Sequence, residues 1–218
     1  MSGILCLMVL FAGFSGEEGT EYLIISTSLL DGDWAEFENQ WFGLFEEDSL
    51  FELREVEIQL RESPYEAEEW ERPNPIIIDI LIEQEEPLFI VSSSEMEFLP
   101  GIVPCAQGTY QRLLVDTSYS IAAPGVQEVS LFTTEDSLFL SDDSLVQCIS
   151  EIRTGDSSSE CSIAIVWAGD LDRDGRMDLV IDDTSDGYNR YYWKLYLSSE
   201  AEPGSLARLV ASFYDVYY

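Results

Sequence analysis

The sequence predicts a mostly β protein, built from antiparallel, sandwich-like sheets with one or two short helices. Two observations predict this class. Apolar residues alternate with polar ones more often than they recur at helical spacing, and most of these segments are bounded by Gly, Pro, Asn, Asp or Ser. About ten such segments at short spacing suit one or two packed sheets.

The clearest strand pattern is LREVEIQLR at 53–61, where Val56, Ile58 and Leu60 alternate with polar neighbours, as in a strand with one wet face. DWAEFENQWFGLF at Asp33–Phe45 predicts a helix, since an Asp occupies the N-cap position and apolar residues follow near helical spacing. Its aromatic residues would also suit a strand. The remaining expected strands are Glu21–Ser28, Ile76–Ile82, Pro87–Ser92, Tyr110–Thr117, Val126–Thr133, Leu145–Arg153, Ser162–Ala168, Asp178–Asp182, Tyr191–Ser198 and Ser205–Tyr214.

Three regions follow from composition. Residues 1–16 resemble a secretory signal peptide, because the apolar run is too short to span a bilayer and small residues follow it. A buried N-terminal strand, or a start placed too far downstream, is the alternative. ESPYEAEEWERPNP at 62–75 is the first candidate for a long loop or linker, and LPGIVPCAQG at 99–108 is a second possible joint. A boundary at the joint at 99–108 divides the rest into an N-terminal β region, 17–100, and a C-terminal β region, 101–218. We therefore expect an exported protein, periplasmic or extracellular, with no membrane insertion after signal removal.

The charge balance excludes several classes of function. The 218 residues carry 43 acidic and 10 basic side chains, for a net charge of -33, with no histidine. Such a field repels nucleic acid and anionic membranes. Without histidine there is no Ser-His-Asp arrangement and no imidazole base, so that only carboxylate chemistry remains. The acidity itself suits a solvated surface in salty water or a face that docks a basic partner.

Cysteine usage predicts one disulfide. Removal of the signal takes Cys6 and leaves Cys105, Cys148 and Cys161. Cys148 and Cys161 lie in two strand-like runs joined by a turn-rich segment, so a bridge across that hairpin is the simplest pairing. It would stabilise the fold by about 3 kcal/mol. Three reduced cysteines are the alternative, which export would disfavour.

The stretch GDLDRDGRMDLVID at 169–182 predicts a calcium loop. A hard cation needs six to eight oxygens, and a loop that alternates acid and spacer turns every second side chain inward. The expected ligands are Asp170, Asp172, Asp174, the backbone carbonyl of Arg176, and Asp178, with Gly175 allowing the sharp turn. An EF-hand is excluded by Ile181 at the twelfth position and by β-like flanks. A solvated acidic turn without metal is the alternative.

A calcium loop that lies between two strands resembles the loop of the FG-GAP or VCBS family. The segment AGDLDRDGRMDLVID of this chain matches the pattern of that family at every position. The continuation YNRYYWKLYLSS and then SLARLVASF is also similar to exported bacterial proteins with one such loop, so that the resemblance covers about residues 162–213. It implies calcium as the cofactor and a compact C-terminal unit. The single copy argues against a full propeller, which needs several blades.

The sequence thus predicts an exported calcium-binding β protein, acting as a non-catalytic binding or surface-interaction module for a protein or a glycan. The calcium is expected to be structural, since binding free energy becomes folding free energy. Two alternatives stay open: a glycan hydrolase that uses paired carboxylates, and a purely structural acidic subunit. With 43 acids in the chain, any pair could be nominated for catalysis, so the first alternative gains nothing from composition.

Overall fold

The computed structural model describes residues 22–25, 30–31, 40–62, 77–82, 87–93, 96, 98–106, 111–151, 160–183 and 190–216. Every regular element within these ranges is a β-strand, which confirms the mostly β class. The expected signal peptide at 1–16 lies outside the described residues. The described part contains no helix that is long and apolar enough to cross a membrane.

The strands follow the chain in this order: β1 (Tyr22–Ile25), β2 (Leu30–Asp31), β3 (Trp41–Glu47), β4 (Leu50–Val56), β5 (Ile58–Glu62), β6 (Ile77–Ile82), β7 (Phe89–Ser93), β8 (Gly101–Val103), β9 (Gln111–Leu114), β10 (Ser118–Ile121), β11 (Val129–Thr133), β12 (Ser137–Ser141), β13 (Val146–Glu151), β14 (Glu160–Gly169), β15 (Asp178–Asp183), β16 (Arg190–Leu197) and β17 (Arg208–Val216).

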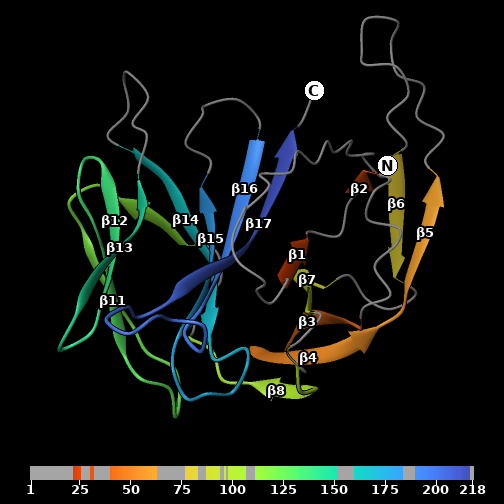
Figure 1. Cartoon of the computed structure of the whole chain (residues 1–218), viewed down its shortest axis with the longest axis horizontal. Coiled ribbons are helices and arrows are strands. Elements are labelled where there is room, and N and C mark those ends of the chain that lie inside the picture. The colour runs from red at the N-terminus through yellow and green to blue at the C-terminus, as the bar shows by residue number, and fades with distance from the viewer. Residues whose placement is uncertain are drawn as a thin grey trace, which may run out of the picture.

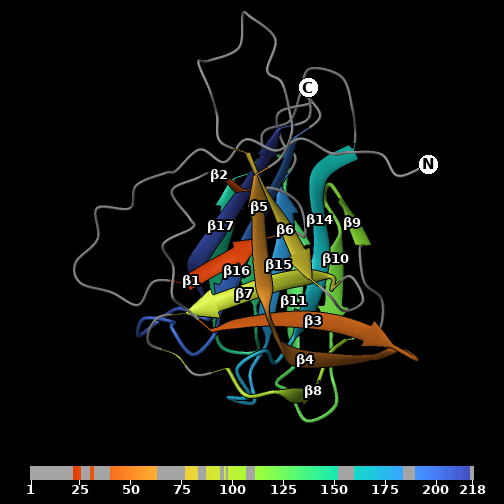
Figure 2. The same cartoon turned by 90° about the vertical axis from the view of Figure 1, so that its right-hand side faces the viewer.

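The strands pair into four sheets (Figure 1). The N-terminal sheet has the order β1-β7-β3-β4-β8, and the central sheet has the order β17-β16-β15-β14-β9. The meander sheet consists of β10-β11-β12-β13 in sequence order, and β2-β6-β5 form a small sheet. Figure 2 shows the same arrangement from the side, with β3, β4 and β8 crossing below the steeply inclined strands of the central sheet.

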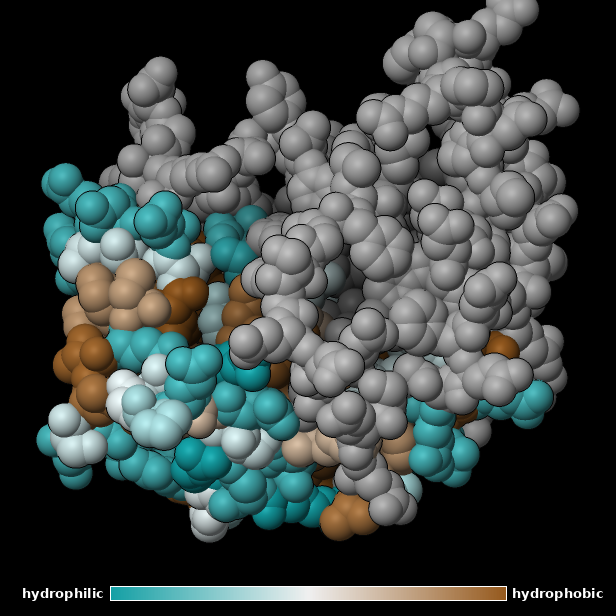
Figure 3. All heavy atoms as spheres, viewed as in Figure 1, coloured by the Kyte–Doolittle hydropathy of each residue, from teal (hydrophilic) through white to brown (hydrophobic). Residues whose placement is uncertain are grey.

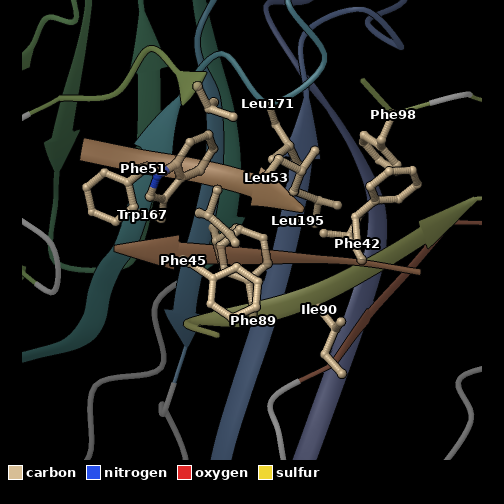
Figure 4. Packing of buried hydrophobic residues seen from close by; sticks show 14 of the residues in the cluster. Phe42, Phe45, Phe51, Leu53, Phe89, Ile90, Phe98, Trp167, Leu171 and Leu195 are labelled. Carbon is tan, nitrogen blue, oxygen red and sulfur yellow. The ribbon is translucent and has the colours of Figure 1, made fainter. Parts of the chain in front are cut away.

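The central sheet is the middle of three layers, because a cluster of buried apolar residues lies on each of its faces. The first cluster joins it to the N-terminal sheet, where Trp167 of β14 packs edge-on against Phe89 with 6.0 Å between ring centroids (Figure 4). The second cluster joins its other face to the meander sheet. The meander-sheet strands contribute Ile121, Val129, Leu131, Leu138 and Leu140 to this second cluster.

Burial on both faces explains why β15 lacks the alternation of a surface strand. Val180 belongs to the first cluster, whereas Leu179 and Ile181 belong to the second. All six residues of β15 are buried, including its aspartates. A strand covered on both faces reads as a continuous apolar run rather than as an alternating one.

The helix expected at Asp33–Phe45 is wrong for its described part, since Trp41–Phe45 begin β3. All five are buried between β4 and β7, and Phe42 packs against Phe98 at 5.8 Å between centroids. Packing of aromatic residues on both faces of a strand thus overrides the helical spacing. Residues 32–39, the rest of the expected helix, lie outside the described residues.

The first cluster contains residues from both expected regions of the chain. Phe98 precedes the joint at 99–108 and Val103 lies within it, and both are buried in this cluster. Strand β8 of the C-terminal region pairs with β4 of the N-terminal region through Phe51 and Val103. The two regions therefore share one core.

Figure 3 shows one face of the molecule, on which hydrophilic residues dominate the described part. Apolar residues occur there in smaller groups. Over the described chain the large hydrophobic side chains that are most exposed are Leu50, Leu99, Ile102, Leu114 and Val146. Such scattered exposure is ordinary for a folded domain.

Candidate metal centre

The acidic loop expected from the sequence joins β14 to β15, whose last pair is Gly169 and Asp178. Glycine is needed at position 169 because two backbone segments of the chain, at Gly169 and at Pro104, approach each other closely there. A Cβ at this position would lie 2.4 Å from the Trp167 ring and 2.5 Å from the carbonyl oxygen of Pro104. That carbonyl accepts a 2.9 Å hydrogen bond from the amide of Asp170, so the loop starts from a fixed point.

Two spacer residues anchor the loop in the two clusters. Leu171 is fully buried in the first cluster and Met177 is buried in the second. Between them, Arg173 and Gly175 adopt left-handed backbone conformations, with φ of 65° and 82°. Gly175 therefore occupies the sharp turn for which the sequence predicted it.

The loop aspartates cap the amides of the loop itself. The Gly175 amide donates to Asp170 Oδ2 at 2.9 Å, the Asp174 amide donates to Asp172 Oδ1 at 3.2 Å, and the Arg176 amide donates to Asp174 Oδ1 at 2.8 Å. The bonds accepted by Asp172 and Asp174 from the amides two residues further on are those of Asx turns. Among the described residues, Asp170, Asp172 and Asp174 each offer one carboxylate oxygen within 4.8 Å of the others.

Asp170 carries the most informative atom in the group. Its side chain is 5 % exposed, and while Oδ2 accepts from Gly175, Oδ1 is buried with no hydrogen-bond partner among the described residues. A buried carboxylate oxygen that lacks a donor destabilises a fold by about 1–3 kcal/mol or more. An atom of this kind, in a group of three converging carboxylates, fits a cation as its missing partner.

The electrostatics of the loop agree with a site that lacks positive charge. Burial raises the pKa of Asp170 and of Asp172 above the usual range, and the neighbouring Asp174 raises both further. The loop carries two guanidinium groups. Arg173 Nη2 donates to the Pro100 carbonyl at 2.9 Å, and Arg176 Nη2 lies 2.7 Å from Asp174 Oδ2. This ion pair is on the exposed side, and it leaves the buried Asp170 unneutralised.

The structure places Asp178 differently from the other expected ligands. It is fully buried and accepts amide hydrogen bonds of 2.8 Å from Leu171 at Oδ2 and from Ser198 at Oδ1. Burial, together with the nearby Asp172, raises its pKa well above the usual range. Asp178 therefore braces the loop here and is not one of the three converging carboxylates. The role of the Arg176 carbonyl as a ligand stays a prediction.

Two serines that the sequence reasoning missed complete the surroundings of the loop. Ser198 and Ser199 follow β16, and their hydroxyls donate to Asp174 at 3.1 Å and to Asp172 Oδ2 at 2.5 Å. The signal that could have found them is strand register. Because Leu179 pairs with Tyr196, the residues just before β15 and just after β16 must lie side by side.

A second buried polar cluster lies away from the loop. Lys194, the chain's single lysine, donates to Asp183 Oδ2 at 2.6 Å and to the Ser150 hydroxyl at 2.9 Å. The Ser150 hydroxyl also donates to Asp183 at 3.0 Å. The ammonium and carboxylate neutralise each other, and both belong to the central sheet, so this cluster is a structural ion pair of that sheet. Ser150 of the meander sheet contacts both groups.

The sequence predicts a disulfide between Cys148 and Cys161, whereas the structure gives Cys148 a free, exposed thiol. Cys105 is also free, and the side chain of Cys161 lies outside the described residues. The expected hairpin does not form, because β13 pairs with β12 at the edge of the meander sheet whereas β14 lies between β15 and β9. The two cysteine-bearing strands thus belong to different sheets.

Comparison with known proteins identifies no relative: no protein-family model, no curated protein and no solved structure matches this chain.

Proposed function

We propose that this chain is an exported calcium-binding β protein, in which the loop at 170–178 holds a structural calcium ion. The single observation that carries the proposal is the buried, unpartnered Oδ1 of Asp170 beside two further carboxylates. A protein interior tolerates such an atom when an ion or water pairs with it. Three negative charges at this range favour a cation over water.

The donor set favours a hard divalent ion. Calcium binds oxygen ligands at about 2.4 Å, so two oxygens on one ion can lie at most about 4.8 Å apart. The three carboxylate oxygens meet that limit. The donor set is all oxygen, which suits calcium better than zinc, whose sites use histidine and cysteine. The likeness of the loop to FG-GAP and VCBS sequences supports the same ion.

A structural role follows from what the loop residues contact. Leu171 and Met177 fix the two sides of the loop in different clusters, and Asp170 is tied to the Pro104 carbonyl. The ion would supply the positive charge that lets the loop carboxylates stay ionised when buried. The free energy of binding would then stabilise the junction of β14, β15 and the preceding connector.

The export and partner parts of the proposal rest on other features. Export is supported by the signal-like run at residues 1–16, and the role in binding a protein or a glycan stays a prediction from the sequence. We assign the chain no catalytic residue, and regard it as a binding or surface-interaction module.

The test is a thermal melt of the purified protein with calcium and with chelator, on wild type and Asp172→Ala. At calcium one hundred times Kd, binding stabilises the fold by about 2.7 kcal/mol. For a chain of this size, that corresponds to a Tm rise of roughly 5–11 °C. We expect this rise in wild type and its loss in Asp172→Ala.

Asp143→Ala is the matched control, because it removes the same charge from an exposed position between β12 and β13. It should keep the full calcium response. A magnesium series at equal ionic strength separates specific binding from screening. Equal melting of wild type with calcium and with chelator would contradict the metal assignment.

A further inference from the structure

The turn that follows β16 makes more contacts with the acidic loop than any other distant segment described. Ser198 is 1 % exposed, and its amide donates to Asp178 Oδ1 at 2.8 Å. Its hydroxyl lies 3.0 Å from the same oxygen and 3.1 Å from both oxygens of Asp174. Ser199 adds the 2.5 Å contact with Asp172. Two consecutive serines therefore reach three of the loop carboxylates.

These contacts are built on a fixed support. The carbonyl of Ser198 accepts from the Ala201 amide at 3.1 Å, so the turn is closed on itself. Further along, the Gln147 side chain of β13 accepts from the amides of Leu206 and Ala207 at 2.7 and 3.1 Å, and donates to the Ala207 carbonyl at 2.7 Å. The segment between β16 and β17 is thus held at both ends independently of the loop.

The serine hydroxyls can orient the loop carboxylates, but they cannot neutralise the carboxylate charge. A serine hydroxyl has one proton to donate, so Ser198 Oγ bonds either Asp178 or one oxygen of Asp174 at a time. A neutral donor leaves the carboxylate charge in place and fixes the direction of its remaining lone pairs. Hydrogen bonds of this kind around metal ligands raise metal affinity by about 10–100-fold.

We infer that Ser198 and Ser199 are positioning residues of the cation site, and that the β16–β17 turn sets the affinity of the loop for its ion. The inference rests on the proposed function, because it requires that the group around the unpartnered Asp170 Oδ1 binds a cation. It goes beyond the loop itself, since it makes a segment more than 20 positions downstream part of the site. The coupling is reciprocal, so the ion should also protect this turn.

The experiment is a calcium titration by calorimetry on wild type, Ser198→Ala, Ser199→Ala and Ser199→Thr. Both alanine variants should bind calcium about 10-fold or more weakly. Ser199→Thr keeps the hydroxyl at an exposed position and should stay within about twofold of wild type. Ser205→Ala is the matched control, because Ser205 lies in the same connection and its amide bonds to the Glu202 carbonyl at 2.9 Å.

A mutant cycle with Asp172→Asn shows whether Ser199 acts through its contact carboxylate. Asn keeps one side-chain oxygen that can bind calcium, so calcium binding remains measurable. In Asp172→Asn the amide oxygen takes the place of Oδ1, which accepts from the Asp174 amide, and an NH2 group takes the place of Oδ2, the acceptor for Ser199. Ser199→Ala should therefore cause little further loss in this background. If Ser199→Ala lowers calcium affinity equally in wild type and in Asp172→Asn, then Ser199 does not act through Asp172, and that part of the inference is wrong.

Failure of the inference differs from failure of the proposed function. If wild type does not bind calcium, the proposed function is wrong. If wild type binds and the folded Ser199→Ala protein binds equally well, the inference is wrong while the metal site stands. Because Ser198 is buried, Ser198→Ala could lose stability; Ser199 is exposed, so Ser199→Ala carries the test alone in that event.

Discussion

At the residue scale, Gly169 leaves the least room for a side chain among the described glycines. An added Cβ would meet the backbone oxygen of Pro104 at 2.5 Å, and that oxygen is fixed by the amide of Asp170. We expect Gly169→Ala to lower the free energy of unfolding by about 3 kcal/mol, the upper range for overpacking. Urea unfolding in chelator measures this loss without a contribution from calcium.

Gly204→Ala is the control for this prediction. Gly204 has a φ of 93°, and a Cβ added there would meet no atom within 4 Å, so the substitution tests backbone strain without crowding. It should destabilise by about 1 kcal/mol. If Gly169→Ala loses no more than Gly204→Ala, crowding is not the reason for the glycine.

The three converging carboxylates of the site were predictable from the sequence, because their positions depend on local spacing around Gly175. Asp178 and the serines were not, because their positions depend on long-range pairing. Asp178 faces the amides of Leu171 and Ser198 only once β15 and β16 are in register. Sequence spacing alone therefore assigns Asp178 the same role as Asp170. In the structure Asp178 accepts hydrogen bonds from two amides instead and is not in the group of three carboxylates.

At the element scale, the placement of β13 and β14 in different sheets predicts how the cysteines react. Cys148 is exposed, whereas Cys105 is half-buried and its thiol pKa is raised by burial and then by Glu46. A raised pKa means less thiolate at a given pH, and the thiolate is the nucleophile. Cys148 should therefore be alkylated well before Cys105 in the native protein, as measured by peptide mass mapping.

Treatment with a reductant is the control for the labelling. The free thiol predicts the same Cys148 rate before and after reduction. Labelling of Cys148 only after reduction would restore the disulfide that the sequence predicted.

Alternation of apolar and polar residues predicted strands well where one face of the strand is exposed to solvent, and poorly where both faces are buried or the strand is short. It identified LREVEIQLR, which forms β4 and β5 with a break at Glu57. It missed the short, serine-containing β10 and β12, because strands of four and five residues among turn residues give little periodicity. The segment Trp41–Phe45 was assigned to a helix because burial on both faces removes the alternation altogether.

At the scale of the whole molecule, the central sheet packs against two of the other three sheets. The N-terminal sheet packs on one of its faces and the meander sheet on the other, and the acidic loop places Leu171 and Met177 in the two resulting clusters. An ion at the loop would therefore act on both clusters together. This shared architecture could not be predicted from sequence, because no local pattern shows that two distant segments cover opposite faces of β15.

The buried ion pair of Lys194 and Asp183 joins two neighbouring strands of this central sheet, and Ser150 contacts it from the meander sheet. Their side chains are 13 % and 5 % exposed, so solvent screens the pair little. Lys194→Met should destabilise the protein by about 3–5 kcal/mol, because it leaves a charged carboxylate buried without its counterion. Adding Asp183→Asn should recover part of that loss by removing the charge. Arg54→Met is the comparison, because Arg54 pairs with Glu47 and Glu52 at the surface, where solvent and salt screen the interaction and the loss should be small. A Lys194→Met loss as small as the Arg54→Met loss, measured by urea unfolding, would mean that the buried pair stabilises the fold no more than a surface pair does.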